Sequence, residues 1–124
     1  MDKKLGTLYI VSTPIGNLSD ITFRAVKILD FVDIIAAEDT RKSGVLLSHY
    51  NIKTKTISYF EHNKFKKIEK IGKILNKGEN VAVITDAGTP GISDPAYKLI
   101  RKAIEIGCKI ESIPGPSAVV ASLV

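Results

Sequence analysis

The chain has 124 residues, of which 44% are hydrophobic and 25% are charged, and its net charge is +5 at pH 7. These values are typical of one soluble globular domain, and no apolar stretch approaches the roughly 20 residues that a membrane-spanning helix needs. The single cysteine, Cys108, excludes an internal disulfide and favours a cytoplasmic setting, while two histidines without ligand-like spacing argue against a metal site. The positive charge permits a polyanionic partner without requiring one.

The first half of the chain alternates between predicted strands and predicted helices. Residues 8–11 form an apolar run typical of a strand buried on both faces. Ser19 or Asp20 can then cap a helix whose apolar residues recur at helical spacing. A second strand is predicted at 33–37, and a short helix around 45–50.

The second half continues this alternation. Residues 56–60 are rich in β-branched and aromatic side chains, which predicts a third strand. Residues 64–77 carry one apolar stripe and end at a glycine, as a surface helix does. A fourth strand at 81–84 precedes a helix that opens at Asp94 and Pro95. That helix stops at a glycine before a fifth strand at 109–113, and another helix begins after residues 114–117.

This order predicts one α/β domain over residues 1–124, with a doubly wound, mostly parallel five-stranded sheet flanked by helices. In a parallel sheet every strand-to-helix loop emerges at the same edge. The loops that share this edge are 12–18, 38–41, 61–63, 85–95 and 114–117. All are polar or rich in glycine and proline, whereas the loops at the opposite edge are plainer. The difference predicts a ligand site at the carboxyl edge of the sheet.

Three common ligand-binding motifs are missing from these loops: Gly-x-Gly-x-x-Gly, Gly-x-x-x-x-Gly-Lys-Ser/Thr and Gly-x-Ser-x-Gly. Their absence disfavours a Rossmann dinucleotide site and excludes a P-loop NTPase. With only two histidines in the chain, a serine hydrolase is disfavoured as well. The loops instead offer backbone that a ligand can approach closely at glycines, hydrogen-bond acceptors such as Asp86, and hydroxyl groups. This set suits a neutral or cationic small ligand with amino and ribose groups.

Four of the loops resemble the motifs of one family, at 13–18, 36–41, 86–95 and 113–117. On these motifs the chain resembles the ribosomal RNA small-subunit methyltransferase I family, a branch of the tetrapyrrole methylases. The resemblance implies 2′-O-methylation of a cytidine ribose in small-subunit (16S) ribosomal RNA, with S-adenosylmethionine as methyl donor. It also implies a dimeric protein of two α/β domains with the cofactor in the cleft between them. This chain would be the N-terminal domain, without the C-terminal one, and would bind the cofactor weakly and be inactive alone.

The resemblance places the cofactor against three loops, and the residues implied are Pro14, Asp86, Gly88, Thr89, Pro116 and Ser117. Asp86 is chemically suited, because a carboxylate accepts hydrogen bonds from ribose hydroxyls or from the amino group of the methionine moiety. The alternative is that Asp86 caps a helix or a turn. The glycines of this loop allow the backbone to approach a ligand closely.

The candidates on the substrate side are Glu38, Asp39, Arg41 and His62. A ribose hydroxyl is a weak nucleophile, and a positioned base contributes about 10²–10⁴-fold to such a reaction. Glu38 or Asp39 could accept the proton, with His62 as a rival, and Arg41 could hold a phosphate through two hydrogen bonds. Alternatively, Asp39 pairs with Arg41 and caps the following helix, and positioning alone supplies much of the rate.

Other functions remain open from the sequence. The same fold could methylate a tetrapyrrole precursor or a protein, or the chain could be a non-catalytic module that binds a ligand or assists assembly. The motif at 38–41 resembles the RNA branch of the family rather than the tetrapyrrole branch. Six lysines between 64 and 77 could contact RNA phosphates, or could be the solvated face of an amphipathic helix.

Overall fold

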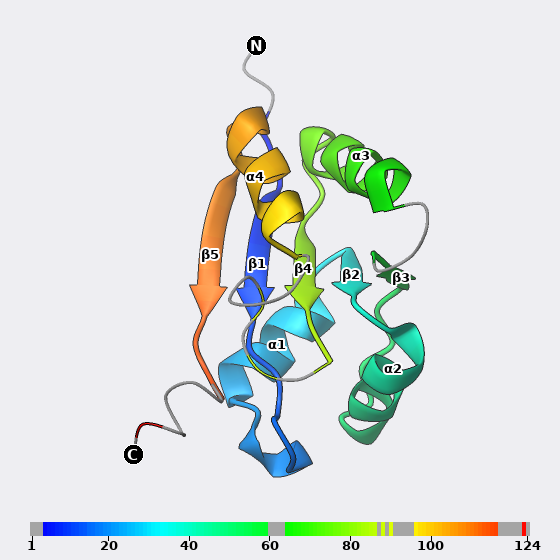
Figure 1. The fold of residues 1–124 in the computed structure, drawn as a ribbon, viewed down its shortest axis with the longest axis vertical. Helices are drawn as coiled ribbons and strands as arrows, with labels where there is room; N and C mark the ends of the chain where they lie inside the picture. Colours follow the sequence, from blue (N-terminus) through cyan, green and yellow to red (C-terminus); the bar gives the residue numbers. More distant parts are fainter. Residues whose placement is uncertain are drawn as a thin grey trace.

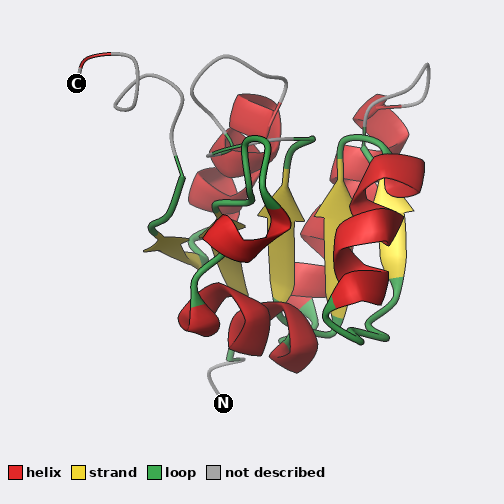
Figure 2. Cartoon of the chain, turned by 90° about the horizontal axis from the view of Figure 1, so that it is seen from below, coloured by secondary structure: helices red, strands yellow, loops and turns green. Residues whose placement is uncertain are grey.

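The computed structural model describes residues 4–59, 64–86, 88, 90, 96–116 and 123, and these form a five-stranded sheet with helices on both faces (Figures 1 and 2). The strands are β1 (Thr7–Val11), β2 (Ile34–Ala37), β3 (Thr56–Ser58), β4 (Val81–Ile84) and β5 (Lys109–Ile113). The helices are α1 (Phe23–Phe31), α2 (Thr40–His49), α3 (Lys64–Asn76) and α4 (Ala96–Ile106), with a 3₁₀ turn at Leu18–Asp20. The predicted α/β fold is confirmed.

The strands lie in the order β3-β2-β4-β1-β5, and every pairing in the sheet is parallel. In the centre, Leu8 of β1 lies between Val81 of β4 and Ile110 of β5. The arrowheads of β1, β4 and β5 point to the same edge in Figure 1. The loops that follow these strands therefore share one edge, as the sequence predicts.

Alternation along the strands divides the core into two layers. Ala82 and Ile84 of β4 pack toward α1 and α2, whereas Val81 and Val83 pack toward α3 and α4. All four of these residues are fully buried. This is why β4 is apolar throughout rather than alternating between apolar and polar residues.

The same division creates a crevice at the carboxyl edge. The chain leaves β1 and β2 toward α1 and α2 on one face, but it leaves β4, which lies between them, toward α4 on the other face. Where neighbouring strands send their chains to opposite faces, a ligand crevice opens at their carboxyl ends. The loops after β1, β2 and β4 therefore surround one position.

Two helices begin elsewhere than predicted. Neither Ser19 nor Asp20 caps α1, because the Asn17 side chain accepts from the Ser19 N–H and builds the 3₁₀ turn. The cap of α1 is Thr22, whose side chain accepts from the Ala25 N–H at 3.0 Å. Helix α2 begins at Thr40, well before the short helix predicted around 45–50.

The predicted helix stops are confirmed. Gly78 and Gly107 follow α3 and α4 with φ angles of +93° and +88°, which glycine adopts without strain. Cys108 is buried in the core, as expected of a small apolar residue. The third strand ends at Ser58, two residues before the predicted end at Phe60. The predicted helix starts at Asp94 and Pro95 and at Ser117 lie outside the described residues.

The described residues include neither a membrane-spanning helix nor a cluster of metal-ligating side chains. None of their helices is long and apolar enough to span a membrane. Within the same part of the chain, no three His, Cys, Asp or Glu side chains group in a way that could hold a metal ion.

Candidate functional site

The loops after β1 and β4 are joined by their backbones. Thr13 N–H donates to the Gly88 carbonyl at 2.9 Å, and Gly88 N–H donates to the Thr13 carbonyl at 3.0 Å. Gly88 has a φ of +85°, a conformation that favours glycine. A Cβ there would lie 3.4 Å from Ile15 Cγ2 and 3.8 Å from the Pro116 carbonyl oxygen. Gly88 is therefore the point where the loops after β1, β4 and β5 meet.

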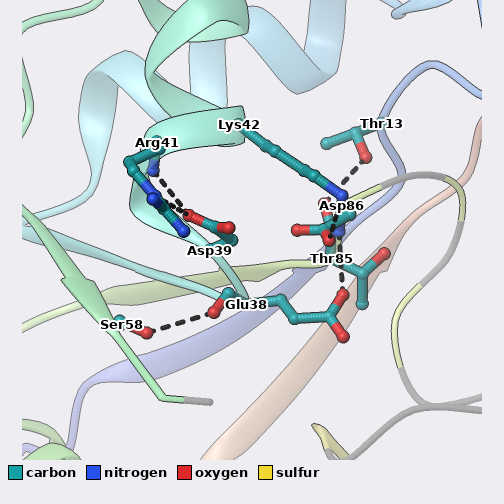
Figure 3. A network of polar contacts seen from close by, with 8 residues as sticks. All are labelled: Thr13, Glu38, Asp39, Arg41, Lys42, Ser58, Thr85 and Asp86. Atoms are coloured by element: carbon teal, nitrogen blue, oxygen red, sulfur yellow. Dashed lines mark hydrogen bonds and ion pairs between the residues drawn. The ribbon is translucent and has the colours of Figure 1, made fainter. Parts of the chain in front are cut away.

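Glu38 connects the loop after β2 to the same place. Its carboxylate accepts from the Asp86 backbone N–H, with a distance of 3.1 Å from the nitrogen to Oε1 (Figure 3). Its own carbonyl accepts from Ser58 Oγ at 3.1 Å. Tyr59 OH adds a link from the end of β3 to the Ile84 carbonyl, also at 3.1 Å. The substrate-side and cofactor-side loops predicted from the motifs are thus in direct contact.

Asp86 is held from the other side by Lys42. Lys42 Nζ lies 3.3 Å from Asp86 Oδ2, and the Asp86 side chain is 31% exposed. The sequence gives no role to Lys42, which belongs to the first turn of α2. The signal that could have found it is its position, directly after the 38–41 motif and four residues after Glu38.

A small cavity of about 90 Å³ lies beside Asp86. The loops after β1 and β4 and the first half of α2 enclose it, and its lining includes Thr13, Pro14, Lys42, Thr85 and Asp86. Pro14 and Asp86, predicted from separate motifs to touch one cofactor, therefore share a cavity. Thr13, which the sequence also missed as a site residue, is buried there and donates to the Thr85 carbonyl at 3.4 Å.

Asp39 and Arg41 form a separate pair that turns away from Asp86 (Figure 3). Asp39 is the N-cap of α2, and its Oδ1 accepts from the Arg41 backbone N–H at 2.8 Å. Arg41 Nε also lies 3.5 Å from the same oxygen, although the arginine side chain is 92% exposed. The alternative in which Asp39 pairs with Arg41 and caps the helix is confirmed. The backbone hydrogen bond from Arg41 holds the pKa of Asp39 below its ordinary value.

Three of the candidate residues, His62, Thr89 and Ser117, lie outside the described residues. The others are brought to one edge, with Glu38, Asp86, Gly88 and Pro116 joined through the loop contacts above.

The fold and this arrangement of loops have counterparts among known proteins. Residues 7–123 match the family model of the tetrapyrrole (corrin/porphyrin) methylases. The chain belongs to this family. Within it, the protein named ribosomal RNA small subunit methyltransferase I of Streptococcus pyogenes (serotype M6) is 50% identical over 99% of this chain. The protein of the same name from Escherichia coli O157:H7 is 48% identical over 98% of it. The chain spans less than half of these relatives, 43% of each.

Solved structures of methylases share the fold. A uroporphyrin-III C-methyltransferase from Thermus thermophilus superposes with a TM-score of 0.74 and 17% identity, over 95% of this chain and 52% of that one. A cobalt precorrin-4 methyltransferase of cobalamin biosynthesis gives a TM-score of 0.74 and 21% identity, over 94% and 48% of the two chains. These structures confirm the predicted fold, and the match to the family model confirms the membership of the methylase family that the loop motifs indicate.

Asp39 allows a test of the helix cap in this methylase domain. Its lowered pKa means that the ionised side chain stabilises the fold above pH 3.8, the ordinary value, and that this stabilisation is lost as the pH falls through the lowered pKa. We expect Asp39→Ala to lower the Tm at pH 7 and to differ less from the unmodified protein near pH 3. Asp39→Asn keeps an accepting oxygen but not the charge, so its Tm at pH 7 should lie between those of Asp39→Ala and the unmodified protein. Thermal unfolding monitored by circular dichroism checks both variants, and equal Tm values for Asp39→Ala and the unmodified protein at pH 7 would contradict the capping role.

Proposed function

We propose that this chain is part of an S-adenosylmethionine-dependent methyltransferase that methylates the 2′-oxygen of a cytidine ribose in small-subunit ribosomal RNA. The identity of about 50% to proteins named ribosomal RNA small subunit methyltransferase I supports this proposal. The observation that carries it is the hydrogen bond between the Glu38 carboxylate and the Asp86 amide. That bond holds a loop suited to the substrate against a loop suited to the cofactor. Since the chain spans 43% of such relatives, we take residues 1–124 as one domain of a two-domain enzyme.

The crevice offers chemical groups that suit the proposed cofactor. Gly88 has no side chain at the point where three loops meet, so a ligand can lie against its backbone. Asp86 offers a partly exposed carboxylate beside the cavity, suited to amino and hydroxyl donors. Pro14 and Pro116 flank these groups, and Thr89 and Ser117 complete the set of proposed contacts. When bound, the cofactor supplies an electrophilic methyl group on a sulfonium.

The work of the chain is then to orient the ribose hydroxyl and to accept its proton. Glu38 is better suited to this than Asp39. Among the described residues, one Glu38 oxygen accepts from the Asp86 amide and the other accepts nothing. Asp39 is engaged by Arg41, and the backbone hydrogen bond from Arg41 lowers the pKa of the Asp39 carboxyl, which weakens Asp39 as a proton acceptor. We therefore assign the base to Glu38, with His62 as the other candidate, and the phosphate contact to Arg41.

The test is methyl transfer by the intact protein from S-adenosylmethionine labelled on the methyl group. Three acceptors are offered in parallel: undermethylated small ribosomal subunits, the protein-free small-subunit RNA and uroporphyrinogen III. Digestion of the labelled RNA to nucleosides should give 2′-O-methylcytidine. Label in uroporphyrinogen III alone would favour a tetrapyrrole methylase, and no label in any acceptor would favour a non-catalytic module.

The same assay examines Arg41. The Arg41 side chain is 92% exposed and pairs with Asp39, at the edge of the crevice. Arg41→Ala should therefore leave the affinity for S-adenosylhomocysteine unchanged. It should reduce methylation at subsaturating subunits by about tenfold, the lower end of the range for a charged hydrogen bond. Arg24→Ala, on α1 and also more than half exposed, is the control. An equal loss of cofactor affinity and methylation would instead assign Arg41 to the cofactor site or to the fold.

A further inference from the structure

The positive charge of the chain gathers on α3 and α4. The basic residues of the two helices are Lys64, Lys66, Lys67, Lys70, Lys73, Lys98, Arg101 and Lys102, and the acidic ones are Glu69 and Glu105. The difference between these eight and two residues is +6, whereas the whole chain has a net charge of +5. The rest of the chain therefore has a net charge of −1. A basic face on a molecule that is otherwise close to neutral is typical of a surface that binds a polyanion.

The two helices present one continuous surface, since they lie side by side on the same face of the sheet (Figure 1). Gly72 of α3 permits the close approach, because a Cβ there would lie 3.1 Å from Lys102 Cε and 3.2 Å from Ile106 Cδ1. Lys102 Nζ then donates to Glu69 Oε1 at 2.9 Å. This ion pair ties α4 to α3 and engages the acidic residue that stands among the lysines of α3.

Three exposed lysines of α3 are left without an acidic partner among the described residues. Lys66, Lys70 and Lys73 line a groove of about 440 Å³ together with Glu69. Lys66 and Lys73 are seven positions apart in the helix, which is about 10 Å along its axis. Since each nucleotide of a strand carries one phosphate, with successive phosphates only a few ångströms apart, this row of ammonium groups can contact several consecutive phosphates.

A second groove adjoins the first and contains an aromatic ring. Its volume is about 250 Å³, and it shares Glu69 with the first groove. Tyr97, Lys98 and Arg101 of α4 contribute to its lining, and Tyr97 is 48% exposed. An exposed aromatic side chain among cations is the arrangement that proteins use to stack the bases of single-stranded nucleic acid. Grooves with such a ring fit a flexible strand better than the flat surface of a membrane.

The basic face begins next to the crevice. Both helices follow parallel strands, so both start at the carboxyl edge of the sheet, and Lys66 and Tyr97 lie in their first turns. We infer that α3 and α4 bind a single-stranded segment of the RNA substrate beside the target nucleotide. Lys66, Lys70 and Lys73 hold its phosphates, and Tyr97 stacks on one of its bases. This inference rests on the proposed function, because it takes RNA as the substrate.

The experiment measures binding of the intact protein to a fluorescein-labelled single-stranded RNA of twenty mixed nucleotides at several salt concentrations. The variant is Lys66→Gln/Lys70→Gln/Lys73→Gln. The matched control is Lys27→Gln/Lys53→Gln/Lys55→Gln, which removes three exposed lysines from other parts of the surface. Each phosphate contact on a single strand contributes about 0.7 to the slope of log K against log salt. The α3 variant should therefore lower the slope by about 2 and the affinity at 0.1 M salt by roughly 100-fold, and should lose far more than the control.

Tyr97→Leu gives an independent signature. Loss of stacking should weaken binding by roughly 5- to 100-fold, yet leave the salt slope unchanged because no phosphate contact is lost. Circular dichroism and the affinity for S-adenosylhomocysteine check that each variant is folded. Equal losses in the α3 variant and its control, or an unchanged affinity of Tyr97→Leu, would overturn the inference.

Two further outcomes separate this inference from the proposed function. If the α3 lysines govern RNA binding but no acceptor is methylated, the RNA surface stands and the proposed activity fails. If subunits are methylated with the same KM by the α3 variant and the control, the activity stands and the RNA surface is wrong. Binding to vesicles of anionic phospholipid that depends on the α3 lysines, without binding to RNA, would assign the face to a membrane instead.

Discussion

Replacing Asp86 by alanine should weaken binding of S-adenosylhomocysteine by about 10- to 100-fold, because a charged hydrogen bond contributes about 1.5–3 kcal/mol. The fold should be unaffected. Within the described residues the carboxylate of Asp86 contacts only Lys42, in an ion pair whose side chains are 67% and 31% exposed. Such exposed pairs add about 0–1 kcal/mol to stability. Titration calorimetry of the intact protein measures the affinity, and thermal unfolding without ligand measures the stability.

Two further variants identify what the carboxylate does. Asp30→Ala removes an equal charge from the exposed face of α1, and it should leave the affinity unchanged. Asp86→Asn keeps an accepting oxygen but not the charge, so its affinity should lie between those of the unmodified protein and Asp86→Ala. An unchanged affinity in Asp86→Ala would remove the loop after β4 from the cofactor site.

Replacing Gly6 by alanine should have the largest effect on stability. A Cβ at Gly6 would lie 1.7 Å from the Glu79 carbonyl oxygen, which belongs to the backbone and cannot rotate away. Gly6 N–H also donates to the Leu75 carbonyl at 2.8 Å, so moving the backbone at Gly6 away from Glu79 would break this hydrogen bond. Overpacking of this kind costs about 1–3 kcal/mol or more. For a domain of this size we expect a loss of roughly 10 °C or more in Tm.

Gly44 provides the matched control for this substitution. It lies inside α2, and a Cβ there would meet nothing within 4 Å. Since alanine is favoured over glycine by about 1 kcal/mol in a helix interior, Gly44→Ala should raise the Tm. Thermal unfolding of both variants checks the pair. A Tm for Gly6→Ala within a degree of that of the unmodified protein would contradict the expectation and show that the backbone at Glu79 can move to make room for the Cβ.

Much of the fold follows from local signals, because β1, β2 and β4 are short, largely apolar runs and α3 and α4 end at glycines. The start of α1 does not follow from local signals. Asn17, Ser19, Asp20 and Thr22 are all capping residue types, and the choice among them depends on a distant contact. The hydroxyl of Tyr50, at the end of α2, donates to the Leu18 carbonyl and holds the 3₁₀ turn in place. A contact across 32 residues cannot be inferred from local sequence.

The residues of the candidate site also divide into those that the sequence predicts and those that it does not. Glu38 and Asp86 are predicted because they stand in motifs that follow strands and resemble those of a known family. Thr13 and Lys42 are missed because only their contacts with residues far along the chain bring them to the site. Lys42 reaches Asp86 across 44 residues, and Thr13 reaches the Gly88 carbonyl across 75. Both contacts require that β4 lie between β2 and β1. The spacing of strands along the chain predicts a parallel sheet but does not set this order.

The central position of β4 also determines which part of the molecule opens last. Its four residues are fully buried, and three of them, Val81, Ala82 and Val83, are paired with strands on both sides, so the amide hydrogens of β4 meet water only when the centre of the sheet separates. β3, with three residues at the edge of the sheet, can fray without that event. Thr85 and Asp86 continue directly from β4. We therefore expect the amide hydrogens of β4, next to the crevice, to exchange most slowly in the domain. Transient local unfolding at the edges of the sheet leaves the centre of the crevice in place.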